Sequence, residues 1–153
     1  MPDPLQLIIF SLDEQRYALR LSSVERTVRM VEITPLPKAP EIVLGVIDVQ
    51  GEVVPVLDMR KRFRLPERVP GIADQLIMAR TARRRVALVI DAVIDVAALP
   101  EDELVEPATI LPRLEYVEGV ARLGDGIVFI HDLDAFLSIE EEQTLETALT
   151  GSG

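Results

Sequence analysis

Short apolar runs separated by polar turns follow one another along most of the chain. In the first half, residues 7–10 and 17–21 form one pair of runs, and residues 46–49 and 53–57 flank Gln50-Gly51-Glu52 as a second pair. The runs are short and rich in β-branched side chains, which favours strands over helices. The pattern therefore predicts two hairpins in this half.

The second half continues with strand-like runs, in which Gly124-Asp125-Gly126 provides a tight turn. The run 86–96 is long and nearly all apolar, and Asp91 and Asp95 interrupt it. We expect this strand to bend and to serve two barrels. A helix is expected only at 139–149, where Ser138 and Glu141 have the spacing of a capping box. The strand-like runs expected in this second half are 76–80, 86–90, 117–123 and 127–130.

The two halves resemble each other, which indicates an internal duplication. The first two segments match at an offset of 69 and the third at an offset of 74, which pairs Gly45 with Gly119 and Asp58 with Asp132. We interpret these two aspartates as capping or turn residues, with metal binding as the minor alternative. The matched segments are 7–10 with 76–79, 17–28 with 86–97, and 45–59 with 119–133.

Two sets of about five short strands predict two small closed or nearly closed barrels that pack together. The fold class is all-β with a short C-terminal helix. We expect one domain over residues 1–153, with one subdomain mainly over 5–65 and the other mainly over 74–137, and exchange of strands between them stays open. The residues expected in the core are Val46, Val54, Val56, Leu88, Ile90, Val120 and Val128.

Composition narrows the functional classes. The chain has 48% apolar residues, no cysteine, no basic leader before its first apolar run and a net charge of −10, which favours a soluble cytoplasmic protein and disfavours nucleic acid as a partner. Residues 60–85 carry nine Lys or Arg and two acidic residues, net +7, which leaves −17 on the rest. We expect a basic hairpin that projects from an acidic body, either as a solvated loop or as a docking patch for an acidic protein surface.

Candidate chemistry is sparse. His131 is the only histidine, and the repeat places it opposite Leu57, which predicts a packed rather than a catalytic side chain. A carboxylate pair could in principle hydrolyse glycosides, but the abundance of carboxylates is more typical of surface charge. The glycines near residue 120 lie between strands, where no helix N-terminus is available to bind phosphate. No enzyme activity, cofactor or metal is expected.

The order of these segments resembles the CheW-like domain over about residues 5–145. The most specific part is GVIDVQGEVVPVLDMRKRF at 45–63, with its glycine hairpin, Pro-Val-Leu-Asp strand end and basic RKRF. The resemblance implies two SH3-like five-stranded barrels without catalytic residues. It also implies an adaptor between the cytoplasmic tips of methyl-accepting chemoreceptors and the regulatory domain of a CheA-like histidine kinase, monomeric alone and recruited to receptor arrays at the membrane.

The resemblance also implies where partners bind. Val24, Arg26 and Thr27 match receptor- and kinase-facing positions, and Gly45, Asp48 and Gln50 match the family's Gly-Val-x-Asn-Leu-Arg-Gly hairpin. Typical members have Glu at Arg26 and Arg at Gln50, so this chain lacks that ion pair, and Arg26 is free to meet Asp48 or Glu52. We expect an apolar groove between the barrels that receives a receptor helix hairpin. Its further candidate lining residues are Val28, Val93, Ile94, Asp95 and Val96.

The chain is therefore interpreted as an adaptor that couples chemoreceptors to a CheA-type kinase in chemotaxis or a related chemosensory pathway. The alternative is a receptor-independent scaffold that binds or sequesters a kinase.

Overall fold

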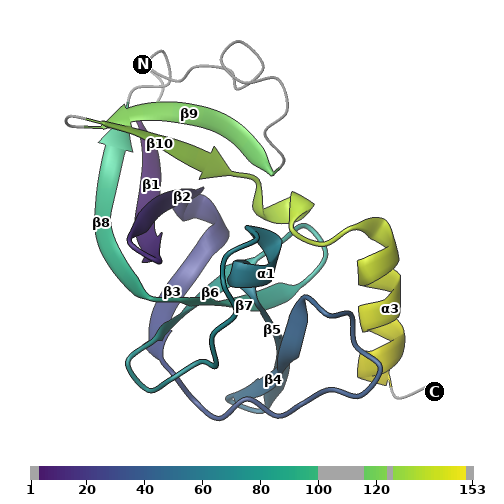
Figure 1. Ribbon diagram of the computed structural model, residues 1–153. Coiled ribbons are helices and arrows are strands. Elements are labelled where there is room, and N and C mark those ends of the chain that lie inside the picture. The colour runs from purple at the N-terminus through teal and green to yellow at the C-terminus, as the bar shows by residue number, and fades with distance from the viewer. Residues whose placement is uncertain (1–3, 100–115, 124–125, 151–153) are drawn as a thin grey trace.

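The computed structural model describes residues 4–99, 116–123 and 126–150, which form two five-stranded sheets with a helix at one side (Figure 1). The strands are β1 (Leu5–Leu12), β2 (Gln15–Arg20), β3 (Val24–Arg29), β4 (Val43–Val49), β5 (Glu52–Leu57), β6 (Gln75–Arg80), β7 (Arg85–Ile90), β8 (Ala92–Leu99), β9 (Val117–Leu123) and β10 (Gly126–His131). The helical elements are η1 (Leu21–Ser23), α1 (Met59–Arg62), η3 (Leu133–Ala135) and α3 (Ile139–Thr150). The all-β class and the short C-terminal helix are confirmed.

Strand pairing confirms the internal repeat. Sheet A has the order β8-β1-β2-β10-β9, and sheet B has the order β3-β6-β7-β5-β4. Each strand of sheet A corresponds to the strand of sheet B at the same place in the order, at the offsets found in the sequence. Registers correspond as well, because the pair Phe10 and Tyr17 matches the pair Ala79 and Val86 at an offset of 69.

The two halves of the chain exchange strands. Sheet A takes β1 and β2 from the first half and β8, β9 and β10 from the second, and sheet B has the converse arrangement. Neither sheet is therefore drawn from residues 5–65 or 74–137 alone. The run 86–96 bends at Asp91, as expected, so that β7 belongs to sheet B and β8 to sheet A. Figure 1 shows β3 and β8 as the strands that lead from one sheet to the other.

Three apolar clusters form the core. One cluster consists of side chains from sheet A, among them Leu7 and Ile130. Another consists of side chains from sheet B, among them Val54 and Leu76. The largest lies between the sheets and includes Phe10. This central cluster takes side chains from both sheets and from α3, so burial of apolar area holds the subdomains together.

The predicted core is confirmed except at Val46. Val46 is half-buried, and its neighbour Ile47 is 2% exposed and lies opposite Val54. The buried positions of β4 are Val43, Gly45 and Ile47, one residue out of phase with the prediction, and the strand carries apolar side chains in both phases. The confirmed residues are Val54, Val56, Leu88, Ile90, Val120 and Val128.

The expected caps are present. Asp58 accepts hydrogen bonds from the backbone of Arg60 and Lys61 at the start of α1, and Asp132 plays the same part at η3. At the start of α3, the Ser138 amide donates to Glu141, and the Glu141 amide donates to the Ser138 hydroxyl. The predicted turn at Gly124-Asp125 lies outside the described residues.

Candidate partner-binding surfaces

The structure distributes the predicted groove residues over two edge strands, β3 of sheet B and β8 of sheet A. Val24 and Val93 are half-buried and both pack against the central cluster between the sheets. Val28 packs instead inside sheet B. Val24 and Val93 are therefore brought to one core, whereas Val28 belongs to another.

The exposed apolar side chains of β8 lie beside Val93. Ile94 and Val96 are 50% and 52% exposed. Val96 pairs with Ile8 and Val93 with Phe10, and both of these β1 side chains belong to the central cluster. Val96 thus extends the apolar surface of Val93 outward. The register shift near Ile94 leaves it outside the regular pairing, and Asp95 and Thr27 are also exposed.

The β4–β5 hairpin holds the other predicted residues. Gly45 is buried, and a Cβ atom there would lie 2.3 Å from the carbonyl oxygen of Thr34, so its role is close packing of the backbone. Asp48 is exposed and accepts a hydrogen bond from the Gly51 amide at 2.8 Å. Gln50 is exposed at the turn with a φ of 52°.

Arg26 is exposed and has no ion pair among the residues that the structure describes. Arg26 makes neither of the expected contacts among the described residues. Glu52 is paired with Arg85 instead, and Asp48 accepts a hydrogen bond within its own turn. Arg85 also binds Glu25 at 2.7 Å. Arg26 therefore presents a free positive charge beside a neutralised cluster.

Asp91 lies at the bend between β7 and β8 and ties several segments together. Its carboxylate accepts hydrogen bonds from the Asp13 amide at 2.8 Å, from Arg60 at 3.0 Å and from Arg68 at 2.7 Å. Partial burial alone would raise the pKa of Asp91, but these donors together hold that pKa below its usual value. The bend that places β8 in sheet A is thus fixed by charge-assisted hydrogen bonds.

The basic segment 60–85 is not a projecting hairpin, which corrects the sequence-based interpretation. It comprises α1, a connecting loop, β6 and β7. Among the residues that the structure describes, five of its nine cations form ion pairs, chiefly with acidic residues distant in the sequence. These five are Arg60, Arg62, Arg68, Arg84 and Arg85. Most of the cations of this segment are therefore paired with carboxylates of the same molecule and are not available to a partner.

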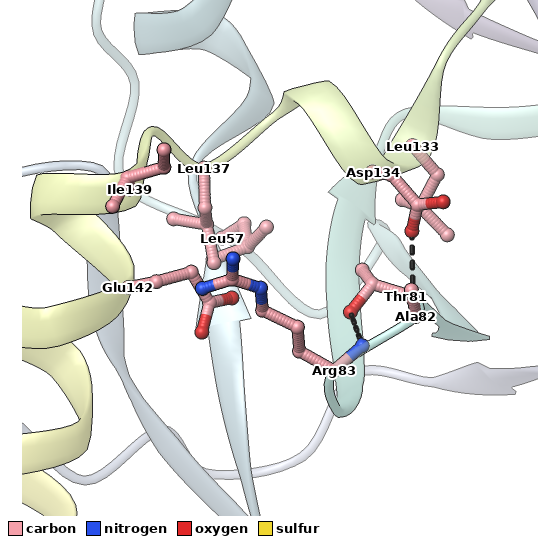
Figure 2. Close-up of a pocket in the computed structure, with 9 residues that line it drawn as sticks. All are labelled: Leu57, Thr81, Ala82, Arg83, Leu133, Asp134, Leu137, Ile139 and Glu142. Atoms are coloured by element: carbon pink, nitrogen blue, oxygen red, sulfur yellow. Dashed lines mark hydrogen bonds between the residues drawn. The ribbon is translucent and has the colours of Figure 1, made fainter.

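One cavity was not anticipated from the sequence. It has a volume of about 120 Å³ and lies between the β6–β7 turn, the η3 segment and the start of α3. Figure 2 shows Arg83 extending from the turn, with Asp134 bonded to the turn backbone on the other side. Four separate stretches of chain contribute its lining, so no local motif could have indicated it.

His131 is buried in a ring cluster with Tyr17, Phe63 and Phe136. Burial lowers its pKa to about 4, although a hydrogen bond involving the Tyr116 backbone acts in the opposite direction. Its Nδ1 atom has no hydrogen-bond partner among the described residues. The expectation of a packed histidine is confirmed.

In the part of the chain that the structure describes, no group of three or more His, Asp or Glu side chains is arranged to hold a metal ion. Within the same residues, every helix is too short or too polar to cross a membrane.

Comparison with known proteins gives a consistent result. A family model described as the CheW-like domain matches residues 6–141. The chemotaxis protein CheW of Treponema pallidum is 26% identical over 149 residues, which cover 94% of this chain and 88% of that protein. The chemotaxis protein CheW of Rhizobium meliloti is 27% identical over 140 residues, which cover 90% of each chain.

A solved structure agrees in fold. The crystal structure of the scaffolding protein TtCheW from Thermoanaerobacter tengcongensis matches with a TM-score of 0.81 and 29% sequence identity. The match covers 90% of this chain and 95% of that one. The arrangement of the two barrels is therefore shared over nearly the whole length of both proteins.

Proposed function

Because the chain belongs to the family of CheW-like domains, we propose that it is a non-catalytic adaptor that holds a CheA-type histidine kinase against the cytoplasmic tips of chemoreceptors. The observation that carries the receptor contact is the exposed apolar surface on the edge strand β8. Monomeric proteins rarely leave β-branched side chains together on a strand edge unless a partner covers them. The adaptor works in the cytoplasm and is recruited to receptor arrays.

The proposed receptor site is the surface formed by Val24, Val93 and Val96. Two of these side chains rest on the core between the sheets, so they are held in place before a partner arrives. Val96 is half exposed and offers apolar area that a receptor helix hairpin can bury. Apolar anchors of this kind supply most of the affinity of an interface.

We expect Val96→Asp to weaken binding of receptor-tip fragments by about tenfold or more, because it places a carboxylate in a desolvated contact. The fold should persist, since Val96 is 52% exposed. The matched control is Ile127→Asp on β10, which is 51% exposed and lies on another strand. Binding is measured by calorimetry with receptor-tip and kinase regulatory-domain fragments, and folding by circular dichroism.

The result separates the two candidate functions. Loss of receptor binding in Val96→Asp alone, with kinase binding retained, supports the coupling adaptor. Undiminished receptor binding by a folded Val96→Asp protein would refute the proposed site. A wild-type protein that binds the kinase fragment but no receptor tip would instead indicate the receptor-independent scaffold.

Arg26, Asp48 and Gln50 are proposed to tune the choice of partner. Arg26 is exposed and unpaired among the described residues, so a partner that presents a carboxylate is favoured. We expect Arg26→Glu to weaken kinase-fragment binding about fivefold and to remove part of its salt dependence. Arg29→Glu makes the same charge change three residues along β3 and should have a smaller effect. Equal losses of affinity in Arg26→Glu and Arg29→Glu would indicate a long-range electrostatic effect rather than a direct contact. Unchanged affinities for every partner in both Arg26→Glu and Gln50→Arg would refute the assignment.

A further inference from the structure

We propose that the cavity beside the β6–β7 turn is a docking pocket for a segment of a partner protein that presents an aliphatic side chain next to a carboxylate. This pocket is separate from the surfaces on β3 and β8, and the proposal does not depend on where receptors bind. The proposal rests on a cavity with an aliphatic floor, bordered by one arginine that has no ion pair within the described part of the chain.

Five of the nine residues that line the cavity are aliphatic, and the other four are polar or charged. Leu57, Leu133 and Leu137 are buried and form its floor, and Ile139 is 66% exposed at its rim. An apolar cavity of about 150 Å³ in another protein admits benzene. A cavity of about 120 Å³ therefore has room for one branched aliphatic side chain.

Two carboxylates and one arginine line the cavity, and of these three side chains only that of Arg83 has no partner among the described residues, which favours an anionic neighbour for the incoming aliphatic side chain. Glu142 is paired with Arg84 at 3.1 Å, and Asp134 accepts a hydrogen bond from the Ala82 amide at 2.7 Å. Arg83 is exposed, and its guanidinium has no partner among the residues that the structure describes. A carboxylate on the incoming segment would form an ion pair with this arginine, because guanidinium groups bind carboxylates through directed hydrogen bonds.

The turn that carries Arg83 is already ordered. The amides of Arg83 and Arg84 donate to the Thr81 hydroxyl at 3.1 and 3.0 Å, and the Thr81 amide donates to the Arg84 carbonyl at 2.8 Å. The bond from Ala82 to Asp134 fixes the same turn to the η3 segment. Binding therefore needs little ordering of the backbone, which preserves affinity for a small contact.

The test uses the ¹⁵N-labelled full-length protein and three blocked tetrapeptides followed by NMR. The peptides are acetyl-Gly-Leu-Glu-Gly-amide, the same peptide with Gln in place of Glu, and the same peptide with Ala in place of Leu. We expect saturable shifts of the amides at 81–84 and 137–142 with the first peptide. The Gln peptide should bind about fivefold more weakly and the Ala peptide about tenfold more weakly.

Two variants test the residues. Arg83→Gln should reduce the affinity for the Leu-Glu peptide to that of the Leu-Gln peptide, whereas Arg80→Gln, an exposed cation at the end of β6 that does not line the cavity, should leave it unchanged. Absence of saturable shifts, equal binding of the three peptides, or unchanged binding by Arg83→Gln would overturn the proposal. Binding of 4-methylpentanoate without any peptide binding would also overturn it, by indicating a small-molecule site.

Discussion

We expect Phe10→Ala to lower the free energy of unfolding by about 3–5 kcal/mol. Phe10 is fully buried in the central cluster between the two sheets and stacks on Tyr17 with ring centroids 5.7 Å apart. Removal of the ring loses its burial and leaves a cavity at the contact that joins the subdomains. Urea titration followed by circular dichroism measures the change.

Phe129→Ala is the matched control. Phe129 lies on β10 and is only half-buried, so the same truncation removes less buried area. Its cost should be less than half that of Phe10→Ala. Similar costs for the two variants would contradict the placement of the main core between the sheets.

The second large effect concerns pH. We expect the protein to lose about 3 kcal/mol of stability as the pH falls from 6.5 to 4, because His131 must stay neutral in the folded state. Burial lowers its pKa from 6.5 to about 4. In this window the unfolded chain binds a proton that the folded protein does not, so acidification favours unfolding. The contribution is fully present above pH 6.5.

The measurement is urea titration at several pH values between 7 and 4. His131→Leu, which places in β10 the residue that the repeat has at Leu57, should remove most of the pH dependence above pH 4.5. Glu141→Gln is the control. Burial alone would raise the pKa of Glu141, but its hydrogen bonds hold that pKa below its usual value. The stabilisation that Glu141 contributes is therefore lost only below about pH 4.5. A wild-type slope retained in His131→Leu would show that another group controls the transition.

Local features of this fold could be read directly from the sequence. The cap at Ser138 and Glu141, the turn at Gln50-Gly51 and the duplication depend on residues close together or on a pattern repeated along the chain. Their structural meaning does not depend on distant partners. The prediction for α3 was therefore confirmed. The bend at Asp91 was also confirmed, although donors distant in the sequence hold it in place.

Features set by distant partners could not be predicted. The positive charge of 60–85 suggested a projecting patch, but Arg62 meets Glu141, 79 residues further along the chain. The strand β4 carries apolar side chains in both phases, so its apolar run alone did not show that Ile47 rather than Val46 lies in the core. The cavity beside Arg83 exists only because the β6–β7 turn, η3 and α3 converge.

The exchange of strands has a consequence for how the molecule folds. Ile8 on β1 pairs with Val96 on β8, so sheet A cannot form before most of the chain has been synthesised, and sheet B likewise needs both halves. Pairings between such distant residues slow folding and make it cooperative. We therefore expect one unfolding transition, in which neither barrel survives alone. Under the proposed function, a single molecule would then offer both of its proposed partner surfaces or neither, so partial unfolding would not produce a competitor that occupies a kinase without a receptor.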